Sequence, residues 1–139
     1  MYNKKVLFIL LILILIVISI GCSDKISMEK EENLEFTVVQ HGDCPEELQR
    51  LIAQKREEKF HLSYKDNGEM YICVGYGKQP TGGYSVNVKE VYTTENAICV
   101  DTTLIGPNEN DLVLKASSFP YVVIKVEYLE RKIIYDDWF

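Results

Sequence analysis

Three of the four cysteines and both histidines are candidates for nucleophilic or metal chemistry. Cys44, Cys73 and Cys99 offer thiols, and His41 or His61 could serve as the base that activates one of them. Cys73 and Cys99 lie in strand-like runs and nothing in the sequence marks a base for either, so buried thiols are the favoured interpretation. His41 and Cys44 could ligate a metal. Without a second ligand cluster, a solvated turn is favoured instead.

The carboxylates give no stronger indication of catalysis. A general acid and base, or a metal centre, would require side chains at a paired spacing, and the acidic residues are scattered. Those considered are Glu46, Glu47, Asp101, Glu127, Asp136 and Asp137. We therefore predict a protein that is not an enzyme, with no catalytic residues, no metal, no cofactor and no small-molecule substrate.

The N-terminal residues predict where the protein is located. Lys4 and Lys5 precede an apolar run over residues 6–18, and Ser19-Ile-Gly-Cys22 follows it. This order of a basic region, an apolar region and small residues is typical of a secretory signal peptide. A retained transmembrane anchor is the alternative, although the run is short of the roughly 20 apolar residues that span a bilayer.

Gly21-Cys22 resembles a bacterial lipobox, with Ser19 where that motif usually has Leu. The resemblance implies that residues 1–21 are a lipoprotein signal peptide and that the Cys22 sulfur receives a diacylglycerol. The mature protein would then be anchored to the cell membrane by acyl chains such as palmitate, with its domain extracytoplasmic. Three cysteines would remain, which leaves either one disulfide with a free thiol or three buried thiols.

The charge of the chain argues against nucleic acid as a partner. Lys4 and Lys5 are the charged residues that precede Cys22, so residues 22–139 hold 13 basic and 21 acidic side chains, a formal net charge of −8. A domain this acidic repels phosphate backbones and anionic headgroups.

Residues 22–34 are charged and poor in aromatic side chains, which predicts a flexible spacer after the lipidated cysteine. Residues 35–139 then form one domain, beginning with a strand near 36–40. A surface helix is predicted near 44–58. Asp43 would be its N-cap, Pro45 would lie in its first turn, and Leu48, Leu51 and Ile52 would lie on its apolar face.

The remainder of the domain alternates between apolar and polar residues with period two, which predicts strands. The clearest runs are residues 69–76, 84–92, 98–104 and 120–128, and shorter ones are residues 60–64, 112–116 and 132–135. Asp66-Asn67-Gly68 is a strong hairpin signal between two of them. The expected fold class is mainly β: an antiparallel β-sandwich or partly open barrel of about seven strands, with one N-terminal surface helix.

Residues 75–84 contain four glycines between two strand-like runs, a composition that indicates tight turns or close backbone approach. A phosphate-binding loop is disfavoured because no helix follows it. Lys78-Gln-Pro-Thr-Gly-Gly-Tyr84, followed by Pro120-Tyr121 before another strand, resembles the C-terminal domain of the PrcB family. That resemblance covers roughly residues 60–126. It implies an accessory subunit of a surface protease complex.

The P-T-G-G-Y motif is also similar, more weakly, to the N-P-T-T-G-Y loop of chagasin-type protease inhibitors. Gln79 replaces the Asn of that loop, Gly82 replaces its second Thr, and no R-P-W loop is present. The function predicted here is therefore a protein-binding accessory module that stabilises or regulates a surface protease. The alternative is an inhibitor that inserts residues 79–84 into a peptidase active site. The predicted partner-binding residues are Gln79, Pro80, Thr81, Gly82, Gly83 and Tyr84.

Overall fold

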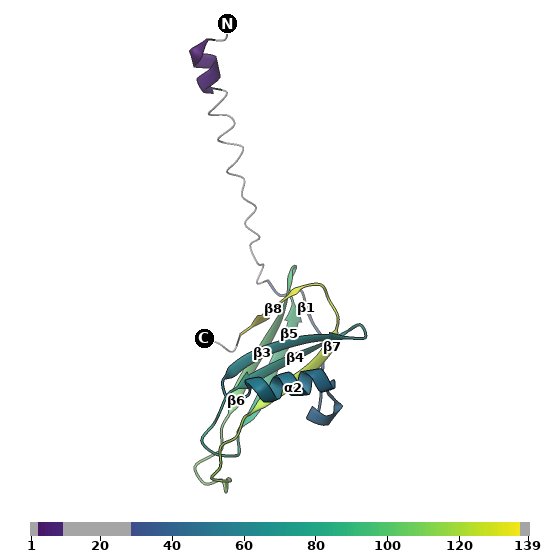
Figure 1. Cartoon of the computed structure of the whole chain (residues 1–139), viewed down its shortest axis with the longest axis vertical. Coiled ribbons are helices and arrows are strands. Elements are labelled where there is room, and N and C mark those ends of the chain that lie inside the picture. Colours follow the sequence, from purple (N-terminus) through teal and green to yellow (C-terminus); the bar gives the residue numbers. More distant parts are fainter. Residues whose placement is uncertain (1–2, 10–28, 137–139) are drawn as a thin grey trace.

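The computed structural model describes residues 3–9 and 29–136 of the chain (Figure 1). Cys22, most of the predicted signal peptide and the last three residues lie outside these ranges. Within the described ranges, no helix is long and apolar enough to cross a membrane. The elements from residue 32 onward are β1 (Glu32–Asn33), β2 (Thr37–Val38), η1 (His41–Asp43), α2 (Glu46–Lys55), β3 (Lys59–Asp66), β4 (Glu69–Tyr76), β5 (Ser85–Thr93), β6 (Ala97–Ile105), β7 (Tyr121–Glu127) and β8 (Lys132–Tyr135).

The strands form two four-stranded sheets, with the orders β1-β5-β6-β8 and β2-β7-β4-β3. Every pairing is antiparallel except that of β6 with β8, which is parallel. The predicted class, a mainly β fold built from a sandwich, is confirmed, and the sheets do not close into a barrel. Among the described residues, α2 is the one helix of at least seven residues.

The main core lies between the two sheets, as the alternating sequence pattern predicts. The first sheet contributes Val91, Ile98 and Val100 to it. The second sheet contributes Ile72, Val74, Tyr76, Val122, Ile124 and Val126. Because both inner faces are β-branched or aromatic at every second position, each strand is fixed in register by its burial.

A second core lies between α2 and the outer face of the β3–β4–β7 sheet, which makes a third layer. Leu48 and Ile52 of α2 are almost fully buried there against Phe60, Tyr71 and further residues. The amphipathic helix was correctly placed, but its predicted cap is wrong. Pro45 occupies the N-cap position without a side-chain cap, because residues 41–43 instead form the 3₁₀ helix η1.

Local turn chemistry shapes two of the strand pairs. Asn67 and Gly68 both have positive φ, 47° and 77°, in the two-residue turn between β3 and β4, as the Asp-Asn-Gly signal predicts. In β5, a bulge between Val88 and Glu90 shifts the register against β6. The extra residue brings Val91 to the core face, although it lies an odd number of positions from Val88.

The first sheet includes residues within the range predicted as a spacer. Glu32 pairs with Thr93 and Asn33 with Tyr92, and the Leu34 amide donates to the Val91 carbonyl. These contacts are made by the backbone, so the acidic side-chain composition of the segment does not predict them. The β structure therefore begins three residues before the predicted start of the domain at residue 35.

Gly75 is predicted to be the least replaceable residue of the helix-covered face. A Cβ at this position would lie 2.1 Å from Phe60 Cε1, and the ring is held between β3 and α2. We expect Gly75→Ala to lower the free energy of unfolding by about 2–3 kcal/mol, because the core must move to admit a methyl group. Urea denaturation measures this loss. Gly42→Ala is the control, since no atom lies within 4 Å of its Cβ position; equal stability of the two variants would contradict the prediction.

Candidate protein-binding loop pair

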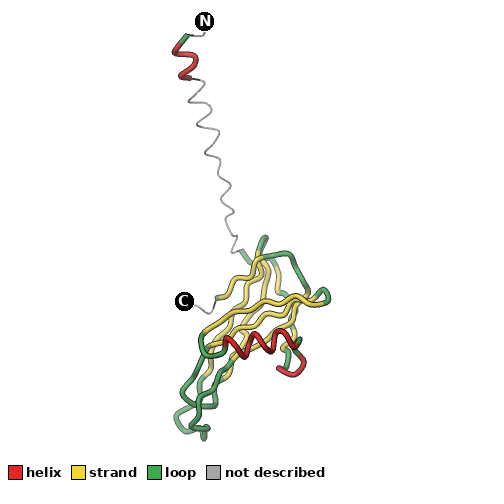
Figure 2. The backbone as a smooth tube through the Cα atoms, in the orientation of Figure 1, coloured by secondary structure: helices red, strands yellow, loops and turns green. Residues whose placement is uncertain are grey.

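Two loops leave the same end of the sandwich and together form what we call the two-loop tip, residues 77–84 and 106–120. The first joins β4 to β5 and the second joins β6 to β7. Figure 2 shows them as the loops at the lower end of the domain. The chain enters at the other end, where Glu32 pairs with Thr93 at the end of β5 remote from Ser85.

Backbone hydrogen bonds join the two loops. Gln79 and Ser118 exchange both of their amide–carbonyl bonds, at 2.8 and 3.1 Å. The Gly82 amide donates to the Leu114 carbonyl at 2.9 Å, and the Ser118 hydroxyl donates to the Thr81 carbonyl at 2.6 Å. Most of the polar backbone of residues 79–82 is thus used to hold the second loop. The second loop is therefore held at Leu114 and Ser118 despite having no regular secondary structure.

The two central glycines of the motif have different roles. Gly83 has a φ of +83°, and a Cβ there would lie 2.7 Å from Val113 Cγ1 and 3.0 Å from Pro107 Cβ. A Cβ at Gly82 would meet Leu114 at 3.5 Å, which is ordinary contact. Gly83 is therefore required both for its backbone conformation and for close approach of the second loop. Gly82 has neither constraint.

The tip is also attached to the body of the domain. The Lys78 amide donates to the Glu57 carbonyl after α2, at 3.1 Å, and the Tyr76 amide donates to the Pro120 carbonyl at 3.0 Å. The Arg56 guanidinium lies over the Phe119 ring, 4.5 Å from its centroid. These contacts fix the start of the first loop and the end of the second loop to the layer formed by α2 and its sheet.

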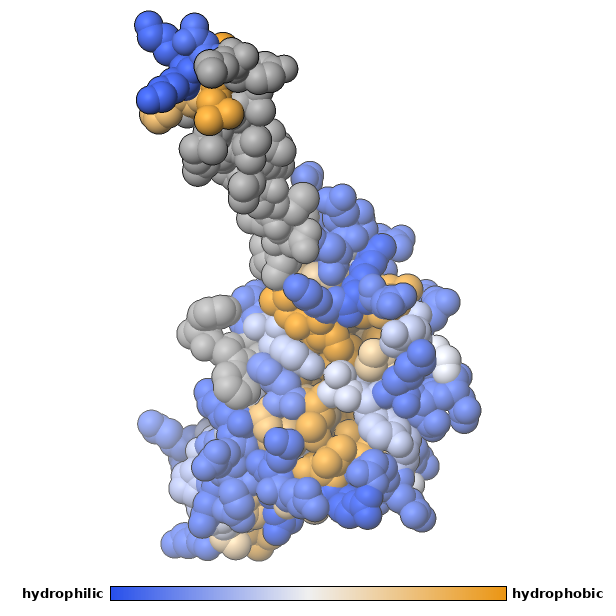
Figure 3. Space-filling model, turned by 45° about the horizontal axis from the view of Figure 1, so that its top comes forward, coloured by the Kyte–Doolittle hydropathy of each residue, from blue (hydrophilic) through white to orange (hydrophobic). Residues whose placement is uncertain are grey.

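The tip exposes two large apolar side chains, Leu112 and Leu114. Leu112 is fully exposed and Leu114 is 80% exposed. The strand predicted over residues 112–116 is wrong: these residues form no strand and belong to the second loop. A turn in which the Asn108 amide donates to Asp111 Oδ2 precedes them. Figure 3 shows apolar surface at the lower end of the domain, the end that the loops form.

The predicted partner-binding residues lie in the first loop, on both its outer and inner sides. Pro80 and Gly83 are exposed, whereas Gln79, Thr81 and Gly82 are half-buried against the second loop. Tyr84 is half-buried and lies 3.1 Å from the Cβ position of Gly106. The sequence interpretation did not identify Leu112 and Leu114 as surface residues. The available signal was a pair of leucines in an otherwise polar segment between a glycine-proline turn and two serines.

The three thiol candidates are buried, and His41 has a side-chain hydrogen-bond partner. Cys44, Cys73 and Cys99 are buried free thiols. Burial raises the pKa of each above its usual value, which keeps the thiols protonated at neutral pH. His41 Nδ1 shares a hydrogen bond of 2.6 Å with the Tyr121 hydroxyl. Among the described residues, no group of three or more His, Cys, Asp or Glu side chains could hold a metal ion.

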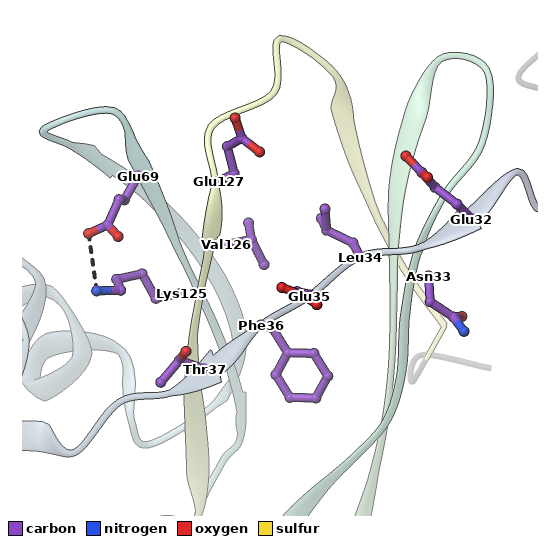
Figure 4. Close-up of a pocket in the computed structure, with 10 residues that line it drawn as sticks. All are labelled: Glu32, Asn33, Leu34, Glu35, Phe36, Thr37, Glu69, Lys125, Val126 and Glu127. Atoms are coloured by element: carbon purple, nitrogen blue, oxygen red, sulfur yellow. Dashed lines mark ion pairs between the residues drawn. The ribbon is translucent and has the colours of Figure 1, made fainter.

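A hollow of about 740 Å³ lies where residues 32–37 cross from one sheet to the other (Figure 4). Its charged lining is mostly acidic, with Glu32, Glu35 and Glu127 beside the ion pair of Lys125 and Glu69, whose N–O distance is 3.1 Å. The hollow follows from the crossing of residues 32–37 between the two sheets.

The fold and the tip together define a class: a two-sheet β-sandwich with a braced loop pair at one end, an arrangement in which a rigid scaffold presents loops. Residues 70–127 match the family model described as PrcB C-terminal, so this part of the chain is similar to that family. The match runs from β4 through β7 and includes both loops of the tip. It confirms the resemblance predicted from the P-T-G-G-Y motif. No curated protein and no solved structure matches the chain.

Proposed function

We propose that this protein is a lipid-anchored, non-catalytic accessory module that binds a surface protease outside the cytoplasm through the two-loop tip. The family match supports an accessory role in a protease complex. The observation that carries the assignment of the surface is the exposure of Leu112 and Leu114 on a loop to which the backbone of Gln79, Thr81 and Gly82 is hydrogen-bonded. Because the loop that carries the leucines is already held in place, its backbone loses little conformational entropy on binding.

The arrangement of the domain suits anchoring at its N-terminal end. Residues 29–33 join the sandwich at the end of β5 that is remote from the tip (Figure 1). A lipid on Cys22 would therefore leave the tip directed away from the attachment point. Restriction to a membrane surface would also raise the effective concentration of the tip for partners held there.

The competing function is protease inhibition by insertion of residues 79–84. Pro80 and Gly83 are exposed and could be presented to a cleft. One observation argues against inhibition: the backbone of Gln79 and Gly82 is already hydrogen-bonded to the second loop. A loop inserted into a peptidase cleft would need those backbone groups free to bond to the peptidase. Extended backbone contacts are the usual means by which a segment binds a peptidase cleft.

Two measurements on the full chain separate these functions. Inhibition kinetics against papain-like and subtilisin-like proteases should show no effect at micromolar concentration. A photo-crosslinking amino acid at position 112, in membranes of the native cell, should yield a covalent adduct with a protease, and the same group at Ser63 on β3 should not. Inhibition at nanomolar concentration would favour the inhibitor, and absence of an adduct at position 112 would contradict the accessory proposal.

Cys22→Ser is expected to abolish the lipid anchor. The serine hydroxyl cannot form the thioether that the proposed modification requires, so metabolic labelling with radioactive palmitate should fall to background. The protein should then remain uncleaved or be released from the membrane fraction. Cys99→Ser is the control, because that thiol is buried in β6 and should have no effect on labelling. Unchanged labelling of Cys22→Ser would refute the anchor.

A further inference from the structure

Residues 111–115 of the second loop form a short segment that we call the tip edge. Leu112 and Leu114 are exposed, whereas Val113 between them is half-buried. The Cγ1 atom of Val113 lies 2.7 Å from the Cβ position of Gly83 in the first loop. Side chains that alternate in this way indicate an extended backbone, because successive residues of a strand point to opposite faces. The tip edge therefore has the form of a strand, although it belongs to neither sheet of the described structure.

One side of the tip edge is bonded to the first loop, and the other side has open backbone groups. The Leu114 carbonyl accepts from the Gly82 amide at 2.9 Å. Neighbouring residues of an extended chain direct their backbone groups to opposite sides, so those of Val113 point away from the first loop. Within residues 29–136, neither the amide nor the carbonyl of Val113 has a hydrogen-bond partner. An unpaired strand side of this kind is a template for another extended backbone.

The undescribed residues next to the domain are too short to cover this side. Residues 137–139 span at most about 11 Å and follow Asp136, whose amide donates to the Val100 carbonyl. β6 continues about 16 Å past Val100 before the second loop begins. Residues 22–28 of the proposed mature chain span at most about 25 Å. They join the domain at the end of β5 remote from the tip, and β5 alone is about 26 Å long (Figure 1).

The sequence of the tip edge is complementary to itself in antiparallel order. Two copies of Asp111-Leu-Val-Leu-Lys115, centred on Val113, place Asp111 of each copy opposite Lys115 of the other, and both of these side chains are exposed. Leu112 then lies opposite Leu114. The open amide and carbonyl of Val113 would meet those of the second Val113 and exchange two hydrogen bonds at the two-fold axis. Opposite charges and apolar side chains directly across from each other both stabilise antiparallel strands.

We propose that two copies of this chain associate through the tip edge as an antiparallel strand pair with two-fold symmetry. The leucines of both copies would lie on one face of the pair, because paired strands share their faces. A pair of five-residue strands is a small interface, so the dimer is weak in dilute solution. Restriction to a membrane, which rests on the proposed anchor, would raise the fraction of dimer. The proposed binding of a protease does not require the dimer, so either can fail without the other.

Charge reversal tests this pairing. Sedimentation equilibrium of the full chain in detergent micelles, from micromolar to millimolar concentration, should show a monomer–dimer equilibrium. Lys115→Asp and Asp111→Lys each place like charges opposite each other at both ends of the pair, and each should weaken the dimer about fivefold or more. An equimolar mixture of the two variants should regain most of that loss, because every charge then meets its opposite. A monomer at every concentration, or a mixture that associates no better than the separate variants, would overturn the proposal.

A control variant and amide hydrogen exchange locate the contact. Lys78→Asp makes the same change in net charge at an exposed lysine of the first loop, outside the tip edge, and should weaken the dimer less than about twofold. As the concentration of the unaltered chain rises, exchange at Val113 should slow, whereas exchange in β2, at the edge of the second sheet, should not change. Equal weakening by Lys78→Asp and Lys115→Asp, or protection of β2 in place of Val113, would contradict the proposal.

Discussion

Replacing both exposed leucines of the tip, Leu112→Asp with Leu114→Asp, is expected to weaken partner binding about 100-fold while leaving the fold intact. Burial of one leucine at an interface contributes roughly 1.5–3 kcal/mol, and a loss of about 3 kcal/mol in total corresponds to two factors of ten in affinity. Neither side chain contributes to the core, so the free energy of unfolding should change by less than about 0.5 kcal/mol. The affinity is measured by titration of the crosslinked protease, once isolated, with the full chain.

The control places one aspartate, half of the added charge, on an exposed apolar residue away from the tip. Val38 of β2 is 53% exposed and lies on the edge of the second sheet, so Val38→Asp changes charge and exposed apolar area without touching either loop. It should reduce affinity by less than threefold. If the leucine pair and Val38→Asp weakened binding equally, the effect would be one of net charge and the tip would not be the binding surface.

Much of the sandwich could be predicted because its signals are local. The Asp-Asn-Gly turn fixes the β3–β4 hairpin, and the run at residues 69–76 has the bounds that β4 has in the structure. Alternation also places Ile98 and Val100 in the core correctly, because a one-residue slip would expose both. In this strand, the period-two alternation of apolar residues in the sequence matches the side chains that are buried in the structure.

Other parts of the fold depend on contacts between distant residues. The pairing of β1 with β5 uses backbone groups of an acidic segment, and composition alone predicts a spacer there. The parallel pairing of β6 with β8 arises because the chain crosses to the second sheet as β7 and returns. No local pattern of residues 132–135 indicates which strand they join or in which direction.

The candidate site shows the same division between local and distant information. The glycines of the motif correctly indicate a special loop, and Gly83 has the positive φ that such a composition suggests. The alternation of Leu112 and Leu114 predicts a strand, and the prediction is wrong because the Leu114 carbonyl accepts from Gly82 instead of from a strand. The first loop therefore holds the second loop in position, and the second loop exposes the two leucines. The sequence alone could not assign these two roles.

Gly83→Val is expected to cause the largest loss of structure at the tip. A valine at a φ of +83° is strained by about 1–3 kcal/mol, and its Cβ would lie 2.7 Å from Val113 Cγ1. The total loss in free energy of unfolding should be about 2–3 kcal/mol, which urea denaturation measures. Because Val113 lies between the two exposed leucines, the same change should increase amide exchange at Gly82 and Ser118, which donate across the two loops.

Gly82→Val is the matched control, since its Cβ position meets Leu114 only at ordinary contact distance and its φ is not positive. Its loss should be below about 1 kcal/mol. A double variant with Val113→Ala then divides the effect of Gly83→Val, because it removes the contact with Val113 Cγ1 and leaves the backbone strain and the contact with Pro107. Recovery of about half of the lost free energy of unfolding in the double variant would show that both causes contribute. Equal losses for Gly82→Val and Gly83→Val would mean that neither the conformation nor the close approach of Gly83 holds the second loop in place.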